Sequence, residues 1–313
     1  MITVSAISSL LWGSAGVEPG AVASAFTDFD ASNNDHLIIR HSRLPRLILG
    51  LIVGVALGLS GALMQSLTRN PLADPGILGI NAGASAAVVI AIAYFGVTDV
   101  GGYLWYALFG AAAATVLVYL LGGTSPARMA LAGAALSMAV GAATSMVLVS
   151  NEHAFNQFRY WTVGTLQGRG MEIIVAVSPF IAVGTLIALL LARALNAMAL
   201  GEESAKGLGV NVAVIRAGCF GAVVLLAGAA TAAAGPIGFI GLAAPHIVRL
   251  IVGPDNRLVL LGVLFTAPAL LIMADAVAKA AAAPAELQTG IAAAVLGGPV
   301  FIALVRSRKV VAL

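Results

Sequence analysis

Long apolar runs are the feature of this sequence that most limits its fold. A helix needs about 20 apolar residues to cross a bilayer. Nine runs approach or exceed this length, at approximately 46–67, 77–95, 103–122, 128–149, 171–192, 213–234, 239–252, 258–277 and 288–305. Only 9% of the residues are charged, against about 25% in soluble domains. Lipid must therefore surround much of the folded chain.

Inside a bilayer, only helices and closed barrels satisfy the hydrogen bonds of the backbone. Barrel strands alternate apolar and polar residues, and these runs do not alternate. The stretch Met1–Trp12 is also apolar, but it is too short to cross alone and lacks the basic start of a secretory signal. We predict an all-α polytopic membrane protein with about ten transmembrane helices, forming one permease domain over residues 1–313.

The basic residues between the runs favour one orientation. If Arg306, Arg308 and Lys309 are cytoplasmic, ten of the 16 lysines and arginines lie inside and six lie outside. This agrees with the positive-inside rule, so we predict a cytoplasmic C-terminus. The loop at about 196–211 is then cytoplasmic, and the basic cluster Arg40–Arg46 is outside.

A short charged segment, "ALGEESAKGLGV", interrupts the apolar sequence in that cytoplasmic loop. Glu202 and Glu203 precede Lys206, the order that suits a helix dipole, and Gly209 is placed to end the helix as a C-cap. A small apolar face would consist of Leu200, Ala205 and Leu208. The pattern predicts a capped helix that docks another protein. A solvated connector is the plain alternative.

The segment "TRNPLADPGILG" joins two of the runs. Pro71 and Pro75 prevent a simple continuous helix. Asn70 and Asp74 can satisfy the freed backbone groups or cap the next helix. We expect a tight turn, with a functional alternative as a short element at the cytoplasmic mouth of a transport path.

Two glycine-rich motifs favour packing. Gly50, Gly54 and Gly58 recur every four residues and let a neighbouring helix approach closely. The segment "GPIGFIGLAAPHIVR" at 235–249 predicts irregular backbone inside the protein or beside a cavity. We expect His246 within it to make a structural hydrogen bond.

Little in the sequence indicates catalysis, proton relay or metal binding. Asp275 and Lys279 share a helix face near the end of a run, without the chain of buried carboxylates that a proton-driven transporter uses. The histidines are scattered, and Cys219 is the one cysteine. A Walker A motif is absent. We expect no catalytic residue, metal or cofactor, and a partner must supply any ATP hydrolysis.

Several motifs, in order along the chain, resemble the permease subunits of ABC importers for iron-siderophores, haem and vitamin B12. They are "RLPRLILGLIVGVALGLSGALMQSLTRNPLADPGILGINAGA", "MALAGAAL" at 129–136, "ALGEESAKGLGV", "GPIGFIGLAAPHIVRL" and "DAVAKAAAAPAELQTGIAAAVLGGPVFIALV". The resemblance implies the ABC type II importer permease fold in a bacterial plasma membrane. It also implies a second permease subunit, two cytoplasmic ATPases and a periplasmic or lipid-anchored binding protein as partners, with no nucleic acid.

The resemblance carries over to four groups of residues. Coupling to the ATPase is implied for Gly201, Glu202, Glu203, Ala205, Leu208 and Gly209. Docking of the binding protein is implied for Arg43, Arg46 and Lys279, the last of which is usually arginine in the family. A cytoplasmic gate is implied for Asn70 and Leu72, and a pathway lining for Ser137, Gly141, Thr144 and Ser145.

Family members begin with a full first helix, whereas only about twelve residues precede Gly13 here, so we expect a short first helix or a start further upstream. The segment "FRYWTVGTLQGR" at 158–169 resembles the siderophore members, which favours ferric siderophore as cargo. Haem and cobalamin remain alternatives. A secondary transporter or channel working alone is a further alternative, and a membrane enzyme a more distant one.

Overall fold

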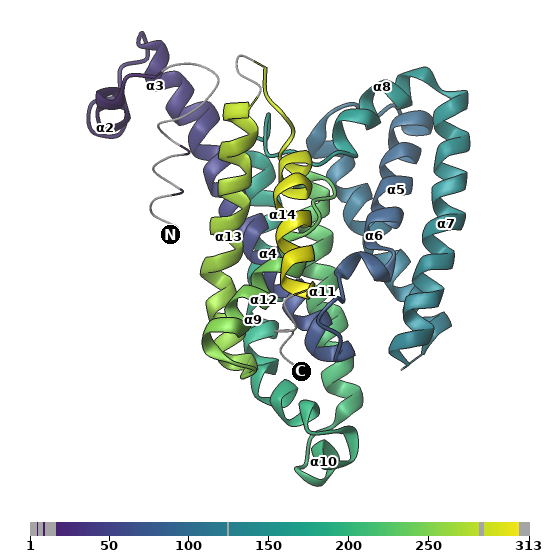
Figure 1. Ribbon diagram of the computed structural model, residues 1–313. Helices are drawn as coiled ribbons and strands as arrows, with labels where there is room; N and C mark the ends of the chain where they lie inside the picture. The colour runs from purple at the N-terminus through teal and green to yellow at the C-terminus, as the bar shows by residue number, and fades with distance from the viewer. Residues whose placement is uncertain (1–4, 6–8, 10–16, 124, 282–284, 307–313) are drawn as a thin grey trace.

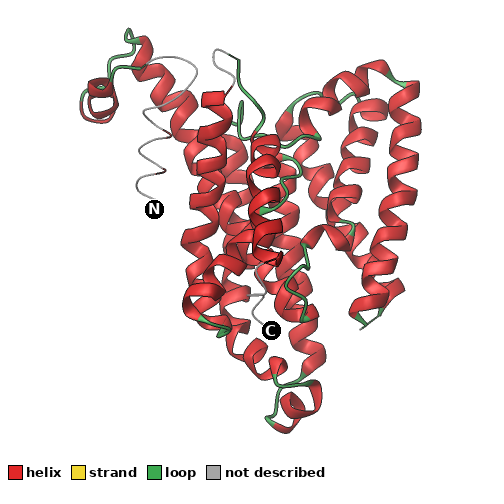
Figure 2. Ribbon diagram, viewed as in Figure 1, coloured by secondary structure: helices red, strands yellow, loops and turns green. Residues whose placement is uncertain are grey.

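A computed structural model describes residues 5, 9, 17–123, 125–281 and 285–306. Most of Met1–Trp12, together with Arg308 and Lys309, lies outside these residues. Every regular element in the described part is helical (Figure 2), which confirms the predicted all-α class. The elements are α2 (Pro19–Thr27), α3 (Asn34–Ile38), the π-helix η1 (Ile39–Arg43), α4 (Leu44–Thr68), the 3-10 helix η2 (Pro75–Leu78), α5 (Ile80–Phe95), α6 (Val100–Gly122), α7 (Pro126–Ser150), α8 (Glu152–Trp161), α9 (Met171–Ala199), α10 (Glu202–Gly207), α11 (Val212–Ala234), α12 (Ile240–Val252), α13 (Asn256–Ala281) and α14 (Thr289–Arg306).

All nine predicted runs form helices. Six helical segments of the described chain are long and apolar enough to cross a membrane. The apolar helices Ile80–Phe95, Ile240–Val252 and Thr289–Pro299 are shorter. The predicted run at 77–95 is the one that the structure divides, because Gly79 adopts a positive φ between η2 and α5.

The central helix of the bundle is α4, which packs against α9, α11, α12 and α13 (Figure 1). The most apolar window of Asn34–Thr68 is 78% buried, whereas that of Ala127–Ser150 in α7 is 11% buried. Helix α7 lies at the edge of the bundle, next to α5 and α6 (Figure 1). Its outer face therefore contacts lipid or another protein.

Small residues explain the close packing around α4. A Cβ atom on Gly54 would lie 2.5 Å from Cα of Pro268 on α13, and one on Gly58 would lie 2.7 Å from Cγ1 of Val263. Side chains at these positions would force α4 and α13 apart. The predicted packing role of the glycine motif is confirmed.

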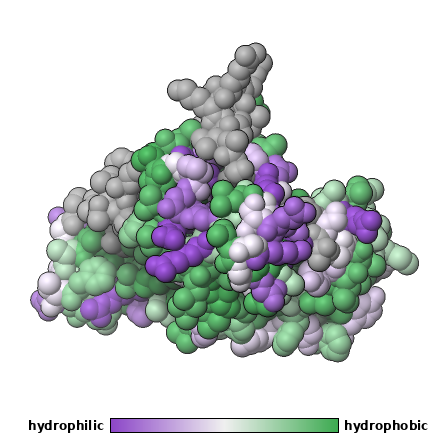
Figure 3. Space-filling model, turned by 90° about the horizontal axis from the view of Figure 1, so that it is seen from below, coloured by the Kyte–Doolittle hydropathy of each residue, from purple (hydrophilic) through white to green (hydrophobic). Residues whose placement is uncertain are grey.

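The two ends of the bundle differ. One end, here called the α10 end, carries α10, the loop after α4 and the start of α13 (Figure 1). Figure 3 views the molecule from this side, where hydrophilic side chains gather on a largely hydrophobic molecule. The opposite end, here called the α8 end, carries α2, α3 and α8.

The α2–α3 segment stands away from the bundle at the α8 end (Figure 1) and has a small polar core of its own. His36 Nδ1 accepts a hydrogen bond from the Asp30 N–H at 3.0 Å, and its Nε2 lies 2.9 Å from Ser24 Oγ. The Arg40 guanidinium lies 4.3 Å from the centre of the Phe29 ring. These contacts link α2, the loop after it, α3 and the start of η1.

Candidate functional site

The charged segment after α9 forms α10, at the tip of the α10 end (Figure 1). Glu202 and Glu203 lie in its first turn and Lys206 in its last, which complements the helix dipole as predicted. Glu202 also pairs with the Arg216 guanidinium on α11. Helix α10 is therefore tied to the next span as well as to α9.

Glycines set both ends of α10. Gly209 has φ of +79°, its N–H donates to the Lys206 carbonyl at 2.9 Å, and the Val210 N–H donates to the Ala205 carbonyl at 3.0 Å. These two bonds form a Schellman motif, so the predicted C-cap is confirmed. Gly201 at the other end has φ of +112°, which glycine adopts readily.

The predicted apolar face of α10 is wrong in part. Ala205 is fully buried beneath the helix, whereas Leu200 and Leu208 are 69% and 64% exposed. The three side chains therefore do not form one face, because Ala205 points into the core and the two leucines point outward. The two exposed leucines flank the charged helix and give it an apolar contact surface on either side.

The two-proline segment after α4 is a turn braced by its own side chains. Asn70 Oδ1 accepts from the Leu72 N–H at 2.9 Å, and Asp74 Oδ1 accepts from the Gly76 N–H at 2.7 Å. The predicted capping roles of Asn70 and Asp74 are confirmed. Burial raises the pKa of Asp74 above its ordinary value, and the Gly76 N–H offsets part of this shift. Leu72 lies at the tip with its side chain about half exposed, at 47%.

The predicted coupling helix and the predicted gate turn lie at the same end of the bundle, and a hydrogen bond connects the helices that lead into them. Arg69, which ends α4, donates a hydrogen bond to the carbonyl of Met198, near the end of α9. These residues are 129 positions apart in the chain. The sequence could not predict this hydrogen bond, because every residue has a backbone carbonyl and nothing in the residue type of Met198 marks it as the acceptor.

The motif at 235–249 has irregular backbone, as predicted, since Gly235 and Phe239 both have positive φ. Arg249 on α12 is 2% exposed and donates to Oε1 of Gln65 on α4. The structural hydrogen bond expected of His246 is not made by its Nε2, which has no partner among the described residues. Gln65 makes the hydrogen bonds between α4 and this motif: its Oε1 accepts from Arg249, and its Nε2 donates to the Gly241 carbonyl at 3.2 Å.

A buried charge cluster occupies the α8 end. Arg46 Nε and Nη2 donate to Asp275 Oδ2 and Oδ1 at 2.9 and 2.8 Å, and Nη1 donates to Glu286 Oε2 at 2.5 Å. Lys279 Nζ lies 3.1 Å from Asp275 Oδ2, and Thr289 Oγ1 donates to Asp275 Oδ1 at 2.7 Å. The shared face of Asp275 and Lys279 is confirmed. The sequence did not predict that Arg46 of α4 pairs with Asp275, because the two residues are 229 positions apart.

The three residues predicted to dock a binding protein lie near one another, but they are buried. Arg43, Arg46 and Lys279 are 5%, 6% and 3% exposed. Lys279 also donates to Ser9 Oγ at 3.1 Å. A polar pocket of about 340 Å³ opens beside Arg46, lined by His41, Ser42, Arg46, Leu166, Gln167, Gly168, Arg169, Gly170 and Glu172. This pocket gives a route to Arg46 from the α8 end.

The four residues predicted to line a pathway lie on one face of α7. Ser137 and Gly141 are half-buried, Thr144 is buried and Ser145 is exposed. Thr144 Oγ1 donates to the Val140 carbonyl at 2.7 Å, and a Cβ on Gly141 would meet nothing within 4 Å. Around Gly141 and Ser145, no other described part of the chain packs against this face.

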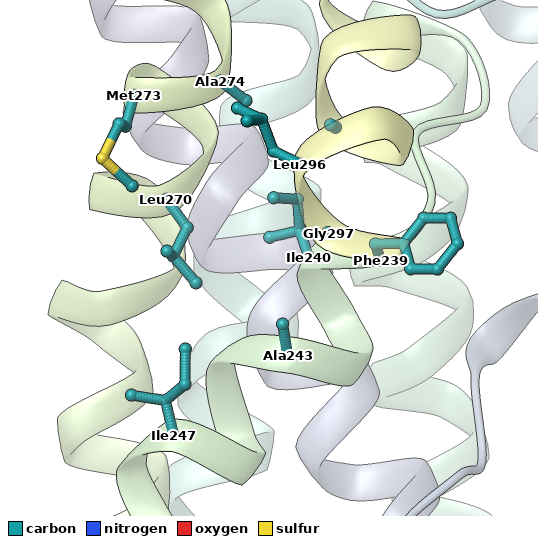
Figure 4. Close-up of a pocket in the computed structure, with 10 residues that line it drawn as sticks. Phe239, Ile240, Ala243, Ile247, Leu270, Met273, Ala274, Leu296 and Gly297 are labelled. Atoms are coloured by element: carbon teal, nitrogen blue, oxygen red, sulfur yellow. The ribbon is translucent and has the colours of Figure 1, made fainter. Parts of the chain in front are cut away.

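A separate hollow of about 90 Å³ lies between α12, α13 and α14 (Figure 4). It is lined by Phe239, Ile240, Ala243, Ile247, Leu270, Met273, Ala274, Ala293, Leu296 and Gly297. Phe239, Ile240 and Ala243 come from the irregular motif and the start of α12 (Figure 4). The lining side chains donate and accept no hydrogen bonds, so the hollow has nothing with which to recognise a polar cargo.

Comparison with known proteins decides the family. The model of the FecCD transport family matches residues 1–307. The chain belongs to the FecCD transport family. It is 40% identical to the ferric enterobactin transport system permease protein FepD of Escherichia coli (strain K12), over 98% of this chain and 93% of the relative. It is 37% identical to the probable siderophore transport system permease protein YfiZ of Bacillus subtilis (strain 168), over 95% and 91%.

The fold of this FecCD chain is similar to that of a solved metal-chelate type ABC transporter in an inward-facing conformation. The TM-score is 0.87 at 28% identity, over 98% of this chain and 96% of the other. The predicted family and the predicted importer-permease fold are confirmed. The FecCD chain is thus a multi-pass ABC permease, a transport protein rather than an enzyme.

Proposed function

We propose that this FecCD permease takes up a ferric siderophore as part of an ATP-driven importer. The observation that carries the proposal is its 40% identity to a ferric enterobactin permease along nearly the whole of both chains. The likeness to a metal-chelate transporter supports the same class of cargo. The importer binds the iron through its chelator, so the permease itself needs no metal ligands.

The assembly we propose contains a second permease subunit, two ATPases and a periplasmic or lipid-anchored binding protein. The whole chain, residues 1–313, acts as one permease domain in the bacterial plasma membrane with a cytoplasmic C-terminus. The sparse burial of α7 supports a second subunit, because large apolar side chains on its outer face, such as Met138 and Met146, are 77% and 75% exposed. A second copy or a close paralogue would cover part of this face.

Helix α10 is the proposed contact with the ATPase. Its exposed charges and its two exposed leucines provide a mixed surface of the kind that protein interfaces use. The coupling residues are Gly201, Glu202, Glu203, Ala205, Leu208 and Gly209. Ala205 is buried beneath the helix, α10 packs against α9, and the two glycines fix the ends of α10, so that a push on α10 moves α9 with it.

The transport path is proposed to run along α7 and to close at the turn after α4. Ser137, Gly141, Thr144 and Ser145 supply a weakly polar lining. Asn70 and Leu72 form the gate, where the exposed Leu72 side chain would meet its counterpart from the second subunit. Small hydroxyl and glycine residues suit a bulky cargo that the binding protein has already selected.

The binding protein is proposed to dock at the α8 end on Arg43, Arg46 and Lys279. Because Arg46 already bonds to Glu286, an acidic side chain of the binding protein would take the place of Glu286 on Nη1. Asp275 would keep the guanidinium in position during this exchange, since it holds Nε and Nη2.

The test is uptake in a strain that lacks only this gene, with labelled ferric siderophores, haem and cobalamin measured in parallel. Loss of siderophore uptake alone is the expected result. Loss of haem or cobalamin uptake instead would keep the importer and overturn the cargo. Uptake that continues after ATP depletion but collapses with the ion gradient would favour a secondary transporter.

A further inference from the structure

The last turn of α9 is hydrogen-bonded to the last turn of α4 at the α10 end. Arg69 Nη2 donates directly to the Met198 carbonyl. Met198 lies four residues before Glu202, where α10 begins, and Arg69 directly precedes the turn that starts at Asn70. One side chain therefore connects the segment leading into α10 with the segment leading into the turn.

A second bridge runs in parallel through the start of α13. Asn196 Oδ1 accepts from the Asn256 N–H at 2.8 Å, and its Nδ2 donates to Asp255 Oδ1 at 2.6 Å. Asn256 Oδ1 accepts from Ser66 Oγ on α4 at 2.6 Å. The hydrogen bond from Asn196 is the largest of the causes that hold the pKa of Asp255 below its ordinary value. The bridge fixes the relative positions of α9, α13 and α4.

The backbone conformation of Arg69 suits glycine better than arginine, which indicates that the arginine side chain has a role at this position. Arg69 has φ of +50° at the C-cap of α4, and it and Phe239 are the two non-glycine residues with positive φ in the described chain. Glycine adopts this conformation without strain and is the usual residue at helix C-caps. An arginine here is strained, and such outliers point to function.

The turn itself is built to move as one piece. Asn70 and Asp74 brace it internally through the Leu72 and Gly76 N–H groups. The Asn70 N–H donates to Gln65 O at 3.1 Å, which joins the turn to the end of α4. A displacement of Arg69 is therefore passed to Leu72 rather than lost within a flexible loop.

We propose that Arg69 is a positioning residue that transmits movement of α10, through α9, to the turn at Asn70–Asp74. This inference rests on the proposed function, in which α10 receives the ATPase and the turn is the gate. The cation–carbonyl bond is directional and charge-assisted, and coupling between sites needs such a contiguous physical link. The bridge through Asn196, Asn256 and Ser66 keeps the three helices in register, so the motion is shared.

The sharpest variant is Arg69→Gly, because glycine suits the backbone and removes only the side chain. The assay uses the complete transporter with its ATPase, reconstituted in liposomes with the binding protein and radiolabelled ferric enterobactin. We expect uptake per ATP hydrolysed to fall about tenfold, with ATPase assembly and the hydrolysis rate close to wild type. Arg69→Lys, which keeps the charge with a single point donor, should give a smaller loss. Arg193→Ala, at an exposed arginine near the same end of α9, is the matched control and should leave the ratio unchanged.

Two results would overturn the proposal. Arg69→Gly with a wild-type transport ratio would show that the bond carries no coupling. A parallel loss of ATPase assembly and uptake would show a structural role instead. Leu208→Asp, measured in the same liposomes, separates this failure from that of the proposed function. If it leaves ATPase assembly intact, α10 is not the ATPase contact, whatever Arg69 does.

Discussion

Arg46 on α4 holds Asp275 on α13 through three hydrogen bonds, at 3.1, 2.9 and 2.8 Å, across 229 residues of sequence. Both side chains are almost fully buried. Lys279 and Thr289 add further bonds to the same carboxylate. The pair therefore links the central helix of the bundle to its main neighbour at the α8 end, where the binding protein is proposed to dock.

Removing Asp275 should be severe. Asp275→Ala leaves Arg46 and Lys279 buried without their shared anion, and breaking a buried pair in this way costs about 3–5 kcal/mol. The measurement is the free energy of unfolding, or the Tm, of the purified protein in detergent. Lys279→Met is the control, because Asp275 keeps Arg46 and Thr289, and its loss should be clearly smaller. Equal losses in the two variants would contradict the central role of the Arg46 pair.

Glu286 should compete with the binding protein for Arg46. Glu286→Gln removes the charge that occupies Nη1, while Asp275 still holds the guanidinium. We expect the binding protein to dock more tightly, by several-fold in Kd, mainly through an increased association rate at low salt. Surface plasmon resonance on the permease in nanodiscs measures both quantities. Weaker docking in this variant would indicate that Glu286 itself belongs to the docking surface.

The contact of α4 with α13 should tolerate no side chain at Gly54. Gly54→Ala places a Cβ 2.5 Å from the Pro268 backbone, and such overpacking costs about 1–3 kcal/mol. Gly221→Ala on α11 meets nothing within 4 Å and gains the helix propensity of alanine, about 1 kcal/mol. Thermal unfolding of the two variants should thus shift in opposite directions. A neutral Gly54→Ala would mean that the helices separate easily at this point.

The half-buried Asp74 should make stability depend on pH. Because burial raises its folded-state pKa above 3.8, the charged form destabilises the fold at neutral pH, and this cost disappears as the pH falls through the raised pKa. Asp74→Asn keeps an oxygen for the Gly76 N–H and carries no charge. We expect the variant to be more stable than wild type at pH 7, with the difference shrinking towards pH 4, about the ordinary carboxyl pKa. A difference that stays constant over this range would show that the carboxylate is adequately solvated.

The sequence alone determined the features that depend on neighbouring residues. The nine apolar runs, the C-cap at Gly209 and the capping by Asn70 and Asp74 were all predictable. Each involves atoms within a few positions of one another, where residue type and spacing are sufficient. The close packing at Gly54 and Gly58 was predictable as well, although its partner helix was not.

Only the tertiary structure decided which distant groups meet. It pairs Arg46 with Asp275 and Arg69 with the Met198 carbonyl, and it buries Ala205 while exposing Leu200 and Leu208. Within the described part of the chain, it leaves His246 Nε2 without a hydrogen-bond partner. These outcomes depend on how each helix is rotated about its own axis and how far it slides along its neighbours. In a chain so uniformly apolar, hydrophobic periodicity hardly constrains that rotation, so the close fit of small residues and a few buried polar contacts fix it.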